Sequence, residues 1–137
     1  LKKRYYKNMP ALAELTKKVT AKAEKEGFVK AIDGRPIKVR SSHSALNFLL
    51  QSAGAIISKA WYNICYEELN EAGFIYGWDW AFLAHVHDEI QFACREDCIE
   101  KLSSIVTNAS KIAGNRLNMR IDIESESKIG NNWAECH

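Results

Sequence analysis

The first third of the chain changes from a helical to a strand-like spacing of apolar residues. Between Pro10 and Glu26 the apolar positions recur every three or four residues, which predicts an amphipathic helix that ends at Gly27. Residues 28–32 and 35–40 then flank Asp33-Gly34, a favoured pair for a tight turn between strands. Pro36 cannot donate a ladder hydrogen bond, so this hairpin should have an exposed edge.

Residues 44–72 have a wide apolar face with helical spacing and follow a serine-rich entry, so they predict one long helix. A second stripe of that helix holds small or polar side chains: Asn47, Gln51, Gly54, Ala55 and Ser58. Small residues permit close packing of another helix. They equally permit the approach of a DNA minor groove, where two amides one turn apart could contact base edges without reading sequence. The sequence alone leaves both interpretations open.

Residues 81–86 and 89–94 alternate in the manner of strands and are separated by two residues, His87 and Asp88. This spacing predicts a second hairpin whose turn lacks the usual glycine. A carboxylate held at a rigid tip, with Glu89 beside it, suits Mg²⁺. The alternative is a solvated acidic turn with a surface histidine.

The remainder predicts a helix, a strand and a docked tail. Asp97 and Glu100 are spaced as a capping box for a helix that ends near Gly114. Residues 119–124 alternate as a strand would, and Trp133 is the expected anchor of the tail. The order of elements predicts an α+β fold with an antiparallel sheet packed by long helices.

Charge divides the chain unevenly, although the net charge is only +2. Residues 1–40 hold 12 Lys and Arg against 4 Asp and Glu, a net of +8, and residues 41–137 hold 7 against 13, a net of −6. The cationic hairpin residues Arg35, Lys38 and Arg40 suit a nucleic-acid backbone, or serve solubility alone. A basic part beside an acidic part suggests a phosphate-contacting surface next to a metal-collecting one.

Composition limits the class of protein. No apolar run approaches the ~18 residues of a membrane helix, so no membrane partner is expected. Four irregularly spaced cysteines match neither a zinc site nor a disulfide framework, which favours reduced thiols in the cytoplasm.

Four motifs in this order resemble family A DNA polymerases, the bacterial DNA polymerase I class, and are most similar to its T-seven-like phage type. They cover nearly the whole chain: Asp33-Gly34-Arg35, Leu46-Asn47 with Leu49-Leu50-Gln51-Ser52-Ala53-Gly54-Ala55, Val86-His87-Asp88-Glu89-Ile90-Gln91, and Asn132-Trp133-Ala134 with Cys136-His137. Bacterial members differ within the long helix, where they have Asn-Ala-Pro-x-Gln-Gly. They also carry Arg at the place of His43.

The resemblance implies a fragment of a right-hand polymerase fold. Residues 1–43 would be a distal helix and basic hairpin that join fingers to palm, and residues 44–137 a palm portion with the catalytic hairpin. Asp88 would be a ligand of two catalytic Mg²⁺ ions, which it shares with a carboxylate outside this chain, and Glu89 would support it. His87 would lie near the primer-terminal phosphate.

The resemblance also implies the reaction and the partners. The reaction would be template-directed nucleotidyl transfer from a dNTP to a primer 3′ end in the cytoplasm of an infected bacterial host. Asn47 and Gln51 would contact the primer–template minor groove, and His43, Arg35, Lys38 and Arg40 are the further DNA-binding candidates. The second metal-binding aspartate and the fingers helix of such an enzyme have no counterpart in this sequence. An N-terminal remainder is therefore an expected partner, and a processivity factor is a further candidate.

Two other functions stay open. A noncatalytic DNA-binding module would account for the basic first third but not for the acidic tip. A His-Asp metal phosphohydrolase would use the same dipeptide, but that class places it on helices, and here it falls between predicted strands.

Overall fold

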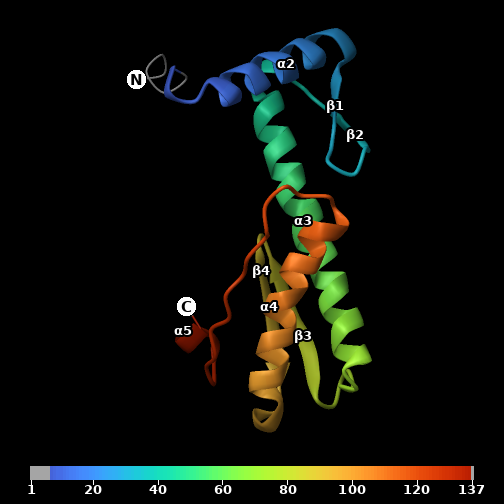
Figure 1. The fold of residues 1–137 in the computed structure, drawn as a ribbon, viewed down its shortest axis with the longest axis vertical. Helices are drawn as coiled ribbons and strands as arrows, with labels where there is room; N and C mark the ends of the chain where they lie inside the picture. Colours follow the sequence, from blue (N-terminus) through green and yellow to red (C-terminus); the bar gives the residue numbers. More distant parts are fainter. Residues whose placement is uncertain (1–6, 137) are drawn as a thin grey trace. The chain divides into compact units, whose positions relative to one another are not determined.

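The computed structural model describes residues 7–136 and divides the chain into two compact units (Figure 1). The first unit ends at Gly54 and the second begins at Ala55. Both residues lie in the long helix α3, Ala45–Glu71, which follows a 3₁₀ turn at Ser42–Ser44. The predicted helix 44–72 is thus confirmed almost to the residue.

The first unit is built from helix α2, Pro10–Glu26, a short hairpin and the start of α3. Pro10 occupies the first turn of α2, and Gly27 ends the helix in a left-handed conformation (φ 74°) with its N–H donated to the carbonyl of Ala23. Both features agree with the sequence, because proline costs nothing in the first turn and glycine suits the C-terminal cap.

The hairpin of the first unit pairs β1, Phe28–Lys30, antiparallel with β2, Pro36–Lys38. Its loop holds the five residues 31–35 rather than the two predicted, because the chain turns through Ala31 to Gly34, whose N–H bonds the Ala31 carbonyl. Within the described part of this unit, residues 7–54, four buried residues form the core: Val19, Ala23, Val29 and Ala45.

The second unit contains the predicted central hairpin. Strand β3, Trp80–Val86, pairs antiparallel with β4, Glu89–Cys94, and two residues join them. The register shifts between Phe82 and Ala84, so Leu83 bulges out and is 65% exposed. This bulge breaks the simple alternation that the sequence suggested for β3.

Helix α4, Ile99–Arg116, runs beside the hairpin and the second half of α3 (Figure 1). Trp61 donates its indole N–H to the carbonyl of Val106 (2.7 Å), which ties α3 to α4. Eight buried residues from α3, β3 and α4 form the core of this unit: Ile64, Cys65, Leu69, Trp80, Leu102, Val106, Ala109 and Ala113. Burial raises the pKa of the Cys65 thiol to about 12.

Two local predictions in the second unit are wrong. Asp97 caps no helix, because its carboxylate receives two hydrogen bonds from Arg95 instead. Residues 119–124 form no strand, because they lie along α4, where Ser110 donates to the carbonyl of Ile123 (2.8 Å). Trp133 lies in the short helix α5, Trp133–Cys136, where its side chain is 55% exposed, and its role as the anchor of the tail stays a prediction.

The α+β class with antiparallel hairpins is confirmed. All four cysteines are free. Among residues 7–136, every helix is too short or too polar to cross a membrane.

Candidate active site

The turn between β3 and β4 presents the candidate metal-binding carboxylate. His87 and Asp88 are both exposed, and His87 has φ 57°, a left-handed conformation that non-glycine residues rarely adopt. In a two-residue hairpin turn such a position usually holds glycine. Since strained backbone conformations concentrate at functional sites, this turn is a candidate functional site.

The flanks of the turn fix its direction. On α3, the hydroxyl of Ser58 contacts the ring of His85 and donates to the carbonyl of His87 (3.2 Å). On β4, Gln91 donates its amide N–H to the carboxylate of Glu89 (2.8 Å). Asp88 therefore extends from a turn whose two neighbours are both held by hydrogen bonds.

The donor set at this turn fits part of a magnesium site. No group of three or more His, Cys, Asp or Glu able to hold a metal occurs among the described residues. Mg²⁺ usually takes only one or two carboxylates from the protein and completes its shell with water and substrate phosphates. Asp88 and Glu89 are thus suitable ligands that need further oxygens from outside this chain.

Six of the predicted DNA-contacting residues lie in the first unit: Arg35, Lys38, Arg40, His43, Asn47 and Gln51. The seventh, His87, lies in the second unit with Asp88 and Glu89. Lys38, Arg40 and His43 are exposed. Arg35 is ion-paired with Asp33 (2.5 Å). Burial acts to raise the pKa of the Asp33 carboxyl, but the hydrogen bonds and charge of Arg35 hold that pKa below its ordinary value. Arg35 is therefore partly neutralised as a phosphate contact.

The stripe on α3 is exposed at Asn47, Gln51 and Gly54, as a nucleic-acid-facing surface requires. Asn47 and Gln51 stand one helical turn apart, so their amides can reach the same partner. Ser58, the last member of the predicted stripe, is instead only 4% exposed, because the hairpin tip covers it.

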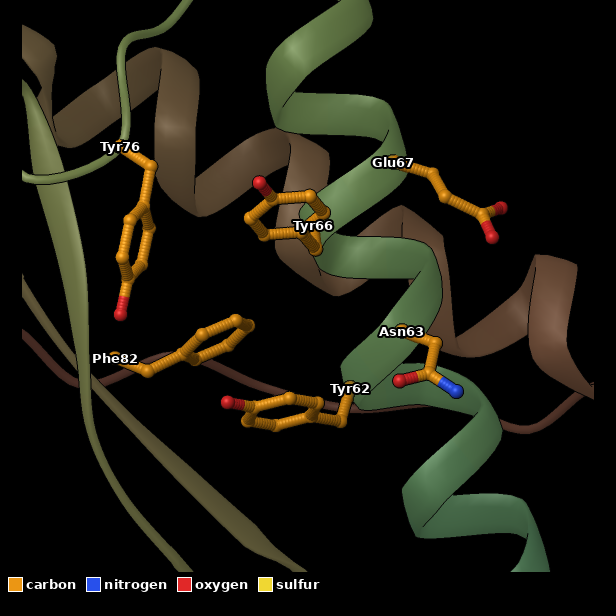
Figure 2. A pocket seen from close by; sticks show the side chains of 6 residues that line it. All are labelled: Tyr62, Asn63, Tyr66, Glu67, Tyr76 and Phe82. Atoms are coloured by element: carbon orange, nitrogen blue, oxygen red, sulfur yellow. The ribbon is translucent and has the colours of Figure 1, made fainter.

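A cavity of about 430 Å³ in the second unit was not predicted from the sequence (Figure 2). Its lining residues are Tyr62, Asn63, Tyr66, Glu67, Tyr76 and Phe82. Tyr62 stacks on Phe82 with ring centroids 3.8 Å apart, and Tyr66 meets Tyr76 edge to face at 5.8 Å. In the sequence, the i, i+4 spacing of Tyr62 and Tyr66 indicates that both side chains lie on one face of the helix. It does not indicate that β3 forms the opposite wall of the cavity.

Comparison with known proteins identifies similar sequences. The model of the family "DNA polymerase family A" matches residues 1–135. The chain is 40% identical over 154 aligned residues to a DNA-directed DNA polymerase of Enterobacteria phage T3 and 39% identical to that of Escherichia phage T7. Each alignment covers 100% of this chain and 22% of the relative, so the chain spans about a fifth of those polymerases.

More distant relatives agree with this assignment. DNA polymerase I of Aquifex aeolicus is 27% identical over 98% of this chain, which corresponds to 23% of the bacterial protein. The fold is similar to the POL domain of Pol1 from M. smegmatis, solved in complex with DNA primer-template and dNTP, with a TM-score of 0.70 and 21% identity. That likeness covers 80% of this chain and 21% of the other. The resemblance inferred from the motifs is confirmed: this chain belongs to DNA polymerase family A and has the fold of a polymerase fragment.

Proposed function

We propose that this chain is the C-terminal part of a template-directed DNA polymerase and that Asp88 is one of its catalytic metal ligands. The observation that carries the proposal is an exposed carboxylate on a strained, hydrogen-bonded turn in a member of DNA polymerase family A. The reaction would add a nucleotide from a dNTP to a primer 3′ end. The cytoplasm of an infected bacterium is the compartment where such an enzyme would act.

The roles of the turn residues follow from their chemistry. Asp88 would supply one carboxylate of the metal site and Glu89 a second, supporting one, with the remaining carboxylate provided by an N-terminal segment of the longer enzyme. When bound, two Mg²⁺ ions would lower the pKa of the primer 3′-hydroxyl and neutralise charge on the departing pyrophosphate. His87, exposed beside Asp88, can donate a hydrogen bond to the primer-terminal phosphate.

The first unit would hold the primer–template. Lys38, Arg40 and His43 are exposed donors for backbone phosphates, and Arg35 is a weaker one because Asp33 already neutralises it. Asn47 and Gln51 would donate to minor-groove acceptors, whose positions are similar in A·T and T·A pairs. These amides would therefore test pairing geometry rather than sequence.

The proposal is tested by Asp88→Asn in the longer polymerase that contains this chain. The change keeps the side-chain size but removes the charge that holds metal, so single-turnover extension should slow by on the order of a thousandfold. Primer–template affinity should stay nearly constant, because it depends mainly on cationic contacts to phosphate. Glu126→Gln, which removes an exposed negative charge elsewhere, is the matched control and should extend normally.

Near-normal turnover by Asp88→Asn would contradict the proposal. Near-normal turnover combined with native primer–template affinity would mean that this chain binds DNA without supplying a catalytic group, as in the noncatalytic DNA-binding module.

A further inference from the structure

Ser58 is a buried hydroxyl that links α3 to the tip of the hairpin. It is 4% exposed, and its oxygen lies within hydrogen-bonding distance of two hairpin groups, the Nε2 atom of His85 and the carbonyl oxygen of His87. Both groups lie within three residues of Asp88. A buried polar group that contacts this turn acts on the backbone that carries the candidate metal ligand.

The direction of each hydrogen bond follows from counting protons. A serine hydroxyl has one hydrogen to donate and can also accept. Since the carbonyl of His87 can only accept, Ser58 donates to it (3.2 Å). The other contact must then run from the Nε2–H of His85 to the Ser58 oxygen. The two bonds form one chain, from His85 through Ser58 to the backbone of His87, and they require a proton on the Nε2 atom of His85.

The ring of His85 is itself held in place. It stacks on Tyr62 of α3, with centroids 5.6 Å apart and planes at 18°, and Tyr62 in turn stacks on Phe82. Helix α3 thus contacts the hairpin through an aromatic stack and a hydroxyl, and both converge on His85.

The supported residue, His87, is the one with the unfavourable backbone. Its φ of 57° is a left-handed conformation that is unfavourable for a non-glycine residue. Without an external partner for its carbonyl, the turn could relax to another conformation, and Asp88 would point elsewhere. The hydrogen bond from Ser58 favours the conformation in which His87 is strained.

From this geometry we infer that Ser58 and His85 are positioning residues, which fix the left-handed conformation of His87 and so the direction of Asp88. The inference rests on the proposed function of Asp88. Neither residue would touch substrate; both would act through the turn. On this inference, Asp88 is held in place by this relay of hydrogen bonds from α3 as well as by the two-residue turn.

The test compares variants of the longer polymerase that contains this chain. Ser58→Ala removes the relay and leaves the helix unchanged, and Ser52→Ala is its matched control, because the Ser52 hydroxyl bonds only the Leu49 carbonyl of its own helix among the described residues. His85→Phe keeps the stack on Tyr62 but loses the N–H donor. His85→Gln restores a donor at a similar reach.

Two readouts are needed. In steady-state extension, kcat should fall about tenfold in Ser58→Ala and His85→Phe, with the KM for primer–template unchanged. His85→Gln should recover most of kcat. Hydrogen–deuterium exchange of peptides that span residues 84–92 should rise about tenfold in the same two slow variants and not in Ser52→Ala. Circular dichroism shows whether each variant is folded.

A native rate and native exchange in Ser58→Ala would overturn the inference. So would faster exchange without a loss of kcat, because the relay would then hold the turn without affecting chemistry. A loss of kcat with unchanged exchange would also overturn it, since Ser58 would act elsewhere. Asp88→Asn is measured in parallel: if that variant is fully active, the proposed function has failed rather than the relay.

Discussion

The two units of the chain differ in both charge and packing. Residues 1–54 carry 12 Lys and Arg against 4 Asp and Glu, a net of +8, whereas residues 55–137 carry 7 against 13, a net of −6. Among the described residues 7–136, the first unit has a core of four small or medium side chains, and the second has a core of eight that includes Trp80. The basic unit is thinly packed, and the acidic unit is heavily packed.

This difference fits the tasks proposed for the units. Contact with a phosphate backbone depends on the number of exposed cations and tolerates small displacements of each one. A catalytic carboxylate must be held within a fraction of an ångström, which requires a rigid support. The hairpin of the second unit has that support, because it shares a core with α3 and α4. The hairpin of the first unit is less suited to hold a carboxylate rigidly, because each of its strands has only three residues.

The largest effect should come from the core of the second unit. Trp80 is 2% exposed and contacts Phe82 and Phe92, so Trp80→Ala should lower the free energy of unfolding by about 3–5 kcal/mol. Val19→Ala in the first unit removes about two buried carbon groups and should cost about 1.6 kcal/mol. Chemical denaturation of the 137-residue chain, followed by circular dichroism, measures both.

Trp80→Phe sharpens this comparison. The indole N–H of Trp80 is buried and has no hydrogen-bond partner among the described residues, so its removal offsets part of the lost packing. Trp80→Phe should therefore cost clearly less than Trp80→Ala. Equal costs for Trp80→Ala and Val19→Ala would mean that the two cores do not differ in strength.

The next effect concerns the exposed polar surface of the first unit. A mispaired primer end displaces the minor-groove acceptors, so native Asn47 and Gln51 should lose hydrogen bonds worth roughly 0.5–1.5 kcal/mol each. An Asn47→Ala, Gln51→Ala double variant has no such bonds to lose. Its ratio of matched to mismatched single-turnover extension should be smaller than the native ratio, and its extension of matched ends should be slower.

A cationic control separates these amides from phosphate contacts. Removal of Lys38 and Arg40 should lower the salt dependence of DNA binding by about one unit per phosphate contact, whereas the amide variant should leave it unchanged. An unchanged extension ratio in the amide variant would favour the other interpretation, in which the stripe packs against protein.

The smallest effects should come from two helical glycines, one in each unit. A Cβ at Gly114 would lie 2.8 Å from Cγ1 of Ile123 and 3.3 Å from its Cβ. The overpacking in Gly114→Ala should cost about 1–3 kcal/mol, which exceeds the roughly 1 kcal/mol that alanine gains over glycine in a helix, so this variant should be destabilised. A Cβ at Gly54 would meet no described atom within 4 Å, so Gly54→Ala should stabilise by roughly 0.5–1 kcal/mol.

Thermal unfolding of the two alanine variants checks the sign of each change. A stabilised Gly114→Ala would mean that residues 119–124 do not pack firmly on α4. A Gly54→Ala that is more stable but binds primer–template less tightly would support close approach of DNA to this part of α3.

The sequence by itself determined the elements whose signals are local. Pro10 and Gly27 mark the ends of α2 because a missing N–H and a left-handed φ depend only on the residue and its immediate neighbours. The two residues between 81–86 and 89–94 defined the central hairpin for the same reason. The family motifs also lie within short stretches, so membership in DNA polymerase family A could be inferred before the fold was known.

Only the tertiary structure decided which group a side chain contacts where the sequence allows several. Residues 119–124 alternate as a strand would, but they pack against α4 instead. Ser110 of α4 donates to the carbonyl of Ile123, and the side chain of Ile123 lies close to Gly114. The same alternation of apolar and polar residues suits that packing equally well. Asp97 has the spacing of a helix cap, but the nearby Arg95 guanidinium competes for its carboxylate and forms two hydrogen bonds to it. Ser58 shares a helical face with Asn47, yet it is buried, because β3 and β4 fold over that part of α3. Such outcomes depend on residues far apart in the chain, and periodicity along one segment carries no information about them.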